Sequence, residues 1–474
     1  MKRALVVLLC AAGCGDDIAA EDPRFASPPD SAEGLTNVSD DLEALLEGGA
    51  LAGACERYRD GDAGDRRARL LCGKEMFFYE SFDTVGAPAS LIDHLARDYP
   101  IELGAGFAEL GMVVDPSAAP RPLGLAPTAP LDDAGDVPAY AFTCASCHFA
   151  QLPDGRYAVG APNHRYDYGR QILALGVYPQ VAIFGAPEGH APEAVDAIRP
   201  LLDRFEADEE IQDALAAAVL PLTGLEGGAP ALGVEVERAY ASWLPGTQDF
   251  VIAPLPLDDG VLTISKIIDL WDIPDRDEEV AAGMPHAMLA WTGAAESLAD
   301  FVAGFAVIGG EEPWDAERLA PLVEYIYSLR APANPEPPDA GVLAEGRALF
   351  DERGCADCHD GPRGSGVRLF DYDEVGTDDA MARWMDPDGD GEPCCGVELT
   401  GTLSGQVKSP RLTGMWAKTR YLHNGSVSSL EGLFCMDGPR GTVTEPAYGD
   451  GGHDMTCDLP PAEKRALIAY LLAH

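Results

Sequence analysis

The sequence predicts a mainly helical protein with two compact helical units in series, loop-rich insertions and an N-terminal helical extension. A five-residue pattern, Cys-x-x-Cys-His, occurs twice, at 144–148 and 355–359. A Pro-rich stretch, 331–338, separates the two copies and is the clearest boundary in the chain. Apolar residues recur at helical spacing over much of 40–100, and the same spacing predicts one long helix over 194–219 and further helices over 235–244, 315–329, 341–352 and 461–472.

The N-terminal residues predict export. Lys2 and Arg3 precede a short apolar run, 4–12, which is too short to span a bilayer. The small residues before Cys14 resemble a bacterial lipobox, which implies cleavage before Cys14 and a lipid on its thiol. The alternative is an ordinary secreted protein cut a few residues later. We therefore expect a periplasm-facing lipoprotein of the bacterial cell envelope, with the outer membrane as the expected location.

The remaining organisation follows the changes in composition. Residues after Cys14 are acidic and aperiodic, as in a tether, and the last helix closes the second unit. The predicted order is a signal peptide (1–13), a lipid-anchored acidic linker (14–39), an N-terminal helical extension (40–130), a first unit (131–330), a Pro-rich linker (331–340) and a second unit (341–474).

The charge excludes one class of partner. The chain has 79 acidic and 33 basic residues, a formal net charge of -46. A protein this acidic lacks the basic surface that neutralises phosphates, and we therefore expect no nucleic-acid partner. A basic partner protein would be attracted instead.

The two Cys-x-x-Cys-His motifs predict covalent haem. The two thiols add across the two vinyl groups of a haem, and the adjacent histidine binds the iron. Cys144, Cys147 and His148 would hold the first haem. Cys355, Cys358 and His359 would hold the second. A four-thiolate zinc site and a thiol redox pair are the alternatives, but neither explains a histidine directly after both motifs.

Six further cysteines predict disulfides in an oxidising compartment. Cys55 and Cys72 are isolated near the N-terminus and are expected to pair. Adjacent cysteines rarely bond to each other, so Cys394 and Cys395 are expected to reach two later cysteines, Cys435 and Cys457.

Several stretches besides the motifs resemble the bacterial dihaem cytochrome c peroxidase superfamily, and in particular the branch that includes the dihaem rubber oxygenases. They are 159–164 (Val-Gly-Ala-Pro-Asn-His), 270–272 (Leu-Trp-Asp), 291–293 (Trp-Thr-Gly), the 301–305 segment, and 409–426 with its Tyr-Leu-His-Asn-Gly-Ser end. The resemblance covers roughly residues 135–474. It implies two cytochrome c domains, one relaying electrons and the other reacting with peroxide or dioxygen.

The resemblance also suggests ligands on the far side of each iron. For the second haem the favoured sixth ligand is His423, with Met436 and Met415 as alternatives. An iron with six ligands cannot bind substrate, so this haem would relay electrons. For the first haem, His164 is the candidate for a distal ligand or an acid/base group beside peroxide.

Three aromatic residues are weaker candidates. In the oxygenase alternative, Trp291 and Phe305 line an apolar pocket where dioxygen binds at the first haem. Trp271 is a candidate electron relay between the haems.

One acidic segment resembles the first half of a calcium loop. Its carboxylates alternate at Asp386, Asp388 and Asp390, but the expected Glu at the twelfth position is absent, since Val397 stands there. A calcium ion or an acidic turn are both open interpretations.

Together these observations predict a lipid-anchored dihaem c-type cytochrome that takes electrons from a small redox protein and reduces hydrogen peroxide. The alternatives are a dihaem oxygenase that uses dioxygen and a non-enzymatic electron carrier.

Overall fold

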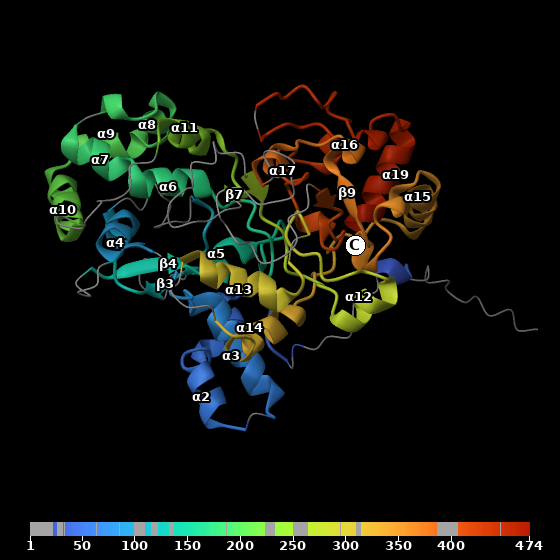
Figure 1. The fold of residues 1–474 in the computed structure, drawn as a ribbon, viewed down its shortest axis with the longest axis horizontal. Coiled ribbons are helices and arrows are strands. Elements are labelled where there is room, and N and C mark those ends of the chain that lie inside the picture. The colour runs from blue at the N-terminus through green and yellow to red at the C-terminus, as the bar shows by residue number, and fades with distance from the viewer. Residues whose placement is uncertain are drawn as a thin grey trace, which may run out of the picture.

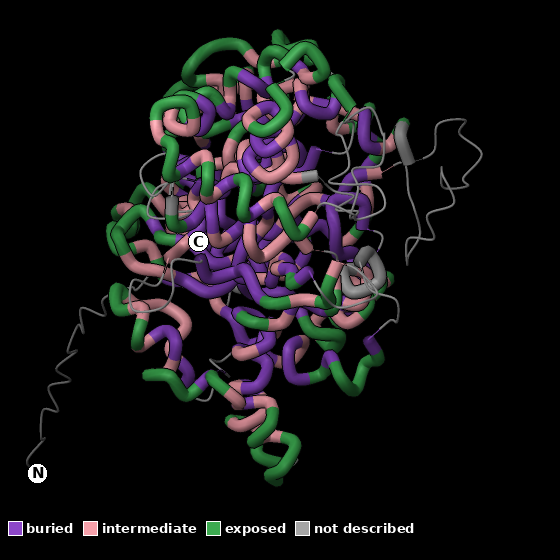
Figure 2. Tube along the Cα trace, turned by 90° about the vertical axis from the view of Figure 1, so that its left-hand side faces the viewer, coloured by how far each residue is buried: buried purple, intermediate pink, exposed green. Residues whose placement is uncertain are grey.

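The computed structural model describes residues 22–25, 32, 34–62, 64–84, 86–98, 110–114, 122–131, 137–185, 187–222, 233–249, 264–293, 295–309, 314–385, 406–445 and 447–474. The fold is mainly helical, as predicted, with a few short strands. Buried residues gather in the middle of the molecule, and a helical tip at its lower end is largely exposed (Figure 2). Within the described residues, no helix is both long and apolar enough to cross a bilayer.

The first unit is built on a crossing of two helices. Helix α3 (Arg66–Tyr79) packs against α14 (Ala316–Tyr327). Gly73 lies at the crossing, where an added Cβ would be only 2.1 Å from the carbonyl oxygen of Pro321. Next to it, the rings of Phe77 and Tyr325 meet edge-on, with their centroids 6.0 Å apart. Only glycine allows so close an approach of the two backbones.

The second unit repeats this crossing. Helix α15 (Ala340–Glu352) packs against α19 (Pro461–Leu472). An added Cβ at Gly346 would lie 2.3 Å from the carbonyl oxygen of Ala466, and the ring centroids of Phe350 and Tyr470 are 5.5 Å apart. In both units a glycine precedes the phenylalanine by four residues. Both units thus place a pair of crossed helices beside a Cys-x-x-Cys-His motif.

The opening helix of the first unit comes from an unexpected part of the chain. We expected residues 40–130 to form an extension outside the haem domains. Instead, α3 shares one hydrophobic core with α14 and with Phe149, which directly follows the first motif. A long stretch of chain separates α3 from this motif, whereas α15 runs almost directly into the second. The local pattern around the first motif therefore did not reveal its opening helix.

The other N-terminal helices flank this core or pack against the helical lobe of residues 168–242 that is described next. They are α1 (Leu42–Leu45), α2 (Ala54–Asp60) and α4 (Ala89–Asp98). Helix α5 (Cys144–His148) contains the first motif, and α12 (Arg276–Ala282) and α13 (Leu298–Gly309) precede α14. In the second unit, the short helices are α16 (Tyr372–Val375), α17 (Ala380–Met385) and α18 (Leu430–Leu433).

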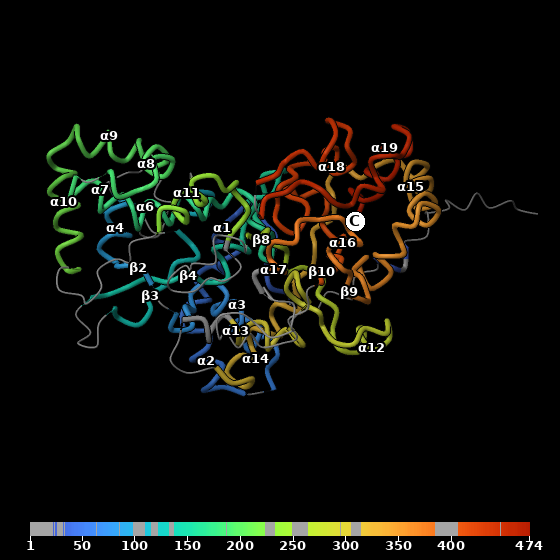
Figure 3. The backbone as a smooth tube through the Cα atoms, turned by 45° about the horizontal axis from the view of Figure 1, so that its top comes forward, coloured from blue at the N-terminus to red at the C-terminus, as the bar shows by residue number. Residues whose placement is uncertain are grey.

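A helical lobe lies at the end of the molecule opposite α15 and α19 (Figures 1 and 3). It contains α6 (Tyr168–Gly176), α7 (Tyr178–Phe184), α8 (Pro192–Ala197), α9 (Arg199–Ala207), α10 (Glu209–Val219) and α11 (Val234–Ser242). The single long helix expected over 194–219 was wrong, because α8, α9 and α10 replace it. Pro200 fits only the first turn of a helix, so α9 begins there. Asp208 then caps α10 by accepting a hydrogen bond from the Glu210 amide.

The strands form four small antiparallel sheets with the orders β1-β6-β5, β2-β4-β3, β7-β8 and β10-β9. Their bounds are β1 Val38–Ser39, β2 Ala87–Pro88, β3 Leu125–Thr128, β4 Ala139–Phe142, β5 Phe149–Gln151, β6 Tyr157–Val159, β7 Thr247–Asp249, β8 Ile264–Lys266, β9 Leu369–Asp371 and β10 Gln406–Lys408. In the β7-β8 pair, Thr247 stands opposite Lys266. Along the chain, this pair falls between the two Cys-x-x-Cys-His motifs.

The disulfides confirm one expectation and correct another. Cys55 pairs with Cys72, as predicted. Cys435 pairs with Cys457, so the expected bonds from these two cysteines to Cys394 and Cys395 are wrong. A loop after α18 brings the Cα atoms of Cys435 and Cys457 within 5.0 Å, which suits a disulfide. Residues 394 and 395 lie outside the described residues.

Part of the expected acidic linker packs on the second unit. The carboxylate of Asp22 accepts a hydrogen bond of 2.6 Å from the hydroxyl of Tyr470. The ring of Phe25 stacks on that of His474 at 4.0 Å. Burial of Phe25 against apolar rings outweighs the extended, polar character of the surrounding sequence. The predicted tether is therefore shorter than 14–39.

Candidate haem sites

The first motif forms one helical turn, α5. The hydroxyl of Thr143 caps this turn by accepting a hydrogen bond from the Ala145 amide, and it donates one to the carbonyl of Phe78 at the end of α3. His148 lies at the last position of the turn, and its Nδ1 is 2.9 Å from the carbonyl oxygen of Ile268. Burial lowers the pKa of His148 to about 4, so the ring is neutral at pH 7 and Nδ1–H is the donor. Nε2 is therefore left with a free lone pair.

The second motif has the same arrangement of a turn and a histidine bonded to a backbone carbonyl. Cys355 begins a 3-10 turn, Cys355–Asp357, directly after α15. The Nδ1 of His359 hydrogen-bonds to the carbonyl oxygen of Gly364. Burial also lowers the pKa of His359. A metal-binding histidine commonly donates its other ring N–H to a carbonyl, which fixes the ring and frees the ligating nitrogen. Both motif histidines meet this requirement.

The four motif thiols are not paired with one another. Burial raises the pKa of Cys144 and of Cys147 to about 12, and that of Cys355 to about 11. Thiols held in the protonated form are poor nucleophiles, which argues against a thiol redox pair. The four-thiolate zinc alternative also loses support, since no three metal-binding side chains gather at one point in the described part of the chain. Covalent attachment to a haem vinyl group remains compatible with these thiols.

A cavity of about 200 Å³ adjoins the second motif. Cys355, Cys358 and His359 line one part of it, and Phe350 of α15 lies beside His359, with 6.4 Å between ring centroids. The first unit also contributes to its wall, through Pro162, His164 and residues 266–269. The cavity thus provides an apolar space beside a thiol pair and a neutral imidazole, which fits a haem bound at this motif.

Two of the three predicted sixth ligands face this cavity. His423 and Met415 line it, whereas Met436 is 37% exposed and is not part of its wall. The Nδ1 of His423 is 3.4 Å from the hydroxyl of Thr377, and its ring meets that of Tyr372 edge-on. Burial lowers the pKa of His423 to about 4, and the nearby charges that act on it are those of Asp378 and Lys266. His423 therefore belongs to the end of the cavity where Lys266 lies.

The sequence reasoning missed a third histidine, His453, which also lines the cavity. Its buried Nδ1 has no hydrogen-bond partner among the described residues. Burial lowers its pKa to about 4, and His453 shares the wall of this cavity with His359. No motif surrounds His453 in the sequence, and only its contacts in the folded chain identify it.

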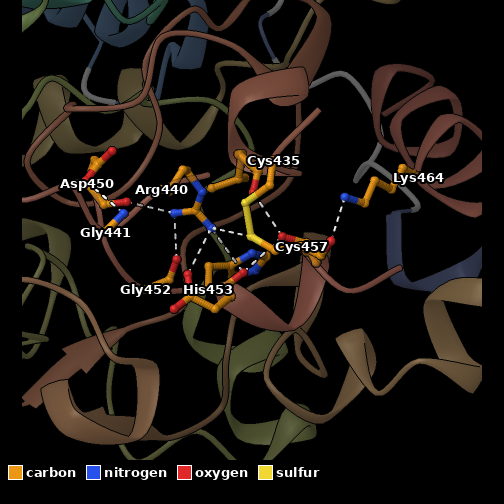
Figure 4. The surroundings of a disulfide bond; sticks show 11 residues. Cys435, Arg440, Gly441, Asp450, Gly452, His453, Cys457 and Lys464 are labelled. Atoms are coloured by element: carbon orange, nitrogen blue, oxygen red, sulfur yellow. Dashed lines mark hydrogen bonds and ion pairs between the residues drawn. A yellow bond between two sulfur atoms is a disulfide. The ribbon is translucent and has the colours of Figure 1, made fainter. Parts of the chain in front are cut away.

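The backbone at His453 is held in a conformation that non-glycine residues rarely adopt, with φ at +59°. Its amide donates to the carbonyl of Val375, and Arg440 donates to its carbonyl oxygen. The Cys435–Cys457 disulfide lies directly beside these contacts (Figure 4). Such a conformation persists only where surrounding contacts fix it, and it is concentrated at functional sites.

His164 is not placed as expected. It is buried and lines the cavity of the second motif, and both of its ring nitrogens already have partners. Nε2 donates to the carbonyl of Ile267 at 3.0 Å, and Nδ1 accepts from the amide of Thr419 at 3.0 Å. These bonds tie the loop after the first motif to the second unit. In this conformation His164 has no nitrogen free for an iron or a substrate, which corrects its assignment as a distal group of the first haem.

Trp291 is also displaced from its expected position. Its Nε1 donates to the carbonyl of Lys266, its ring lies 6.5 Å from that of His423, and it lines the cavity of the second motif. Its assignment to the first haem is therefore corrected. Phe305 belongs to α13, but its side chain lies outside the described residues.

Trp271, the candidate electron relay, packs between the two units, and its relay role stays a prediction. It is completely buried, and its Nε1 donates to the carbonyl of Val159 in the first unit. An added Cβ at Gly160 would lie 2.9 Å from its ring, and one at Gly414 in the second unit would lie 2.6 Å from it. The indole is thus held between loops that follow the two motifs.

The remaining sequence predictions fall outside the described residues: the lipidation site Cys14 and the calcium candidates Asp386, Asp388 and Asp390. They stay predictions.

Comparisons with known proteins add little. No family model matches the chain, and no curated protein matches it. Among solved structures, hydrazine synthase from Kuenenia stuttgartiensis, studied under xenon pressure, is 20% identical, with 50% of this chain and 79% of that chain covered and a TM-score of 0.29. We base no conclusion on so low a similarity.

Proposed function

We propose that this protein is a dihaem c-type cytochrome that transfers electrons, with one haem bound at each Cys-x-x-Cys-His motif. The observation that supports it best is the repetition of one local arrangement. In both units a glycine-based helix crossing adjoins the motif, and a neutral histidine donates Nδ1–H to a carbonyl. Bound haem would supply one-electron redox chemistry, and the chain would supply attachment, ligands and burial.

We place the relay function at the second motif. His359 would hold the iron from one side, and His453 is the favoured ligand on the other, ahead of His423 and Met415. Two imidazoles favour a lower reduction potential than an imidazole and a thioether. A haem held by two ligands from the chain would leave no position for substrate at its iron.

A continuous segment, 264–272, links the two sites. Ile268 accepts the hydrogen bond of His148, while Lys266 and Asp269 line the cavity of His359. Trp271 lies next to the last residue of this segment, buried between the two units. A short, rigid and buried connection suits electron transfer between two haems.

We further propose that the first haem reduces hydrogen peroxide with electrons relayed by the second, which a small basic redox protein supplies. The resemblance in the sequence supports this proposal, whereas His164, with both ring nitrogens hydrogen-bonded, contributes no acid/base group to it. Use of dioxygen at the same haem and simple electron carriage are the alternatives. A lipid on Cys14 would keep the protein at the envelope membrane.

The test begins with the pigment. The protein is produced together with the machinery for cytochrome c maturation and then extracted with acidic organic solvent. Two haems per chain should stay with the polypeptide, one in Cys144→Ala/Cys147→Ala and one in Cys355→Ala/Cys358→Ala. Pigment that leaves the wild-type chain contradicts the proposal.

The reaction is tested on the intact protein. Carbon monoxide should bind one reduced haem per chain, and peroxide should oxidise a reduced donor cytochrome with turnover. If carbon monoxide binds neither haem, only the alternative of a non-enzymatic electron carrier remains. Carbon monoxide binding without peroxide turnover, but with consumption of dioxygen, would favour the oxygenase.

A further inference from the structure

Cationic side chains gather in the interior of a very acidic protein. The chain has six lysines, and three of them line the cavity of the second motif together with Arg411: Lys266, Lys408 and Lys418. All four side chains are buried or nearly so. A buried charge is costly unless it is paired, so this concentration calls for an explanation.

The carboxylate of Asp269 pairs with two of these four cations, Lys418 and Arg411. Lys418 Nζ is 2.7 Å from an oxygen of Asp269, and a guanidinium nitrogen of Arg411 is 3.4 Å from the other. Arg411 also donates to the carbonyls of Trp271 and Asp269. These two cations are therefore fixed and satisfied by the chain.

The other two cations have no carboxylate. Among the described residues, neither Lys266 nor Lys408 has a side-chain hydrogen bond or ion pair. The ammonium of Lys266 lies 5.0 Å from the ring centre of Trp291 and 5.9 Å from that of Tyr421, which compensates part of its lost hydration. Burial, together with the neighbouring positive charges, lowers the pKa of each lysine to about 7, and the charge of Asp269 opposes only part of this shift.

We infer that Lys266 and Lys408 form a carboxylate-binding site, and that its occupants are the two propionates of the haem attached at Cys355 and Cys358. This inference depends on the proposed haem at the second motif. In a covalently attached haem, the thioether edge faces the cysteines and the propionates project from another edge. The thiols of Cys355 and Cys358 and the two unpaired lysines all line this one cavity. Two unpaired cations also match two carboxylates.

The site would tune the second haem as well as hold it. Adding an electron to the iron is more favourable beside positive charge, so loss of a buried ammonium should lower the midpoint potential. Pairing with the propionates would also restore the charged form of both lysines.

The experiment uses the haem-loaded protein and measures the midpoint potential of the six-coordinate haem by spectroelectrochemistry. Lys266→Met and Lys408→Met should each lower the equilibrium constant for reduction of this haem about tenfold. For one electron, this corresponds to a decrease in midpoint potential of about 59 mV. Lys408→Arg keeps the charge, and Arg199→Met removes a positive charge from the exposed surface of α9. Arg199→Met is the control and should leave the potential near that of the wild type, whereas Lys408→Arg should lower it less than Lys408→Met.

Resonance Raman bands of the propionates provide a second measurement. They should shift in both methionine variants and not in Arg199→Met. Unchanged potential and unchanged bands in variants with full haem content would overturn the inference. If a free carboxylate or phosphate fills the site instead, the wild-type potential would depend on acetate or phosphate concentration, which also overturns it. A wild-type chain without haem at Cys355 and Cys358 would instead overturn the proposed function.

Discussion

Two glycines of α15 make a matched pair for testing the helix crossing. A Cβ added at Gly346 would lie 2.3 Å from the carbonyl oxygen of Ala466 and 2.5 Å from the Cβ of Tyr470, both far inside contact distance. At Gly341, in the first turn of the same helix, an added Cβ meets nothing within 4 Å. The two substitutions to alanine therefore differ mainly in packing.

The magnitude follows from two opposing effects. Alanine is preferred over glycine inside a helix by about 0.5–1 kcal/mol. Overpacking a close contact costs about 1–3 kcal/mol, and here the obstacle is backbone and the root of a side chain, which cannot move aside. We expect Gly346→Ala to lower the free energy of unfolding by about 1–2 kcal/mol, and Gly341→Ala to leave it unchanged or raise it slightly.

The assay is urea unfolding of the haem-loaded protein, followed by circular dichroism and by the absorbance of the second haem. The midpoint for Gly346→Ala should fall below that of the wild type, and the midpoint for Gly341→Ala should not. The haem signal should follow, because Phe350 on the same helix contacts His359. If Gly346→Ala is as stable as Gly341→Ala, the close crossing of α15 and α19 is not as described.

Three further predictions concern the second unit and the cavity of its motif. His453→Ala should open one axial position of the second haem, so that carbon monoxide binds there after reduction, while His423→Ala should keep the six-coordinate spectrum; the reverse result would assign the ligand to His423. Replacing Cys435 and Cys457 by serine removes a link across 22 residues and should lower the free energy of unfolding by about 3 kcal/mol relative to the wild type. Under reducing conditions the wild type and the variant should be equally stable, and a difference that remains there would contradict the role of the disulfide. Burial alone would raise the pKa of Asp269, but its two cationic partners lower it to about 2. Since this folded value is below the usual one near 4, the ion pairs stabilise the fold above about pH 4, and this contribution is lost as the pH falls toward 2. Asp269→Asn should destabilise the protein by about 3–5 kcal/mol at pH 7 and flatten the pH dependence of stability between 4 and 2; an unchanged acid profile would contradict this role.

Much of the helical framework was predictable, because its signals are local. The predicted bounds of α19 agree with the structure, and those of α15 differ by one residue. The motif residues needed only their spacing, since Cys355, Cys358 and His359 lie within a single turn. Pro200 and Asp208 were also visible in the sequence, yet the apolar periodicity across 194–219 concealed the breaks that they cause.

The sequence by itself determined where thiols and an imidazole stand close enough to attach a cofactor, because that chemistry needs only consecutive residues. Tertiary structure decided what faces them. It brought α3 across α14, joined Cys435 to Cys457, turned His164 into a bridge between the units and placed His453 in the wall of the cavity that His359 lines. Each of these outcomes depends on contacts between residues far apart along the chain. Such contacts form only when apolar surfaces are buried together, and no local pattern encodes them.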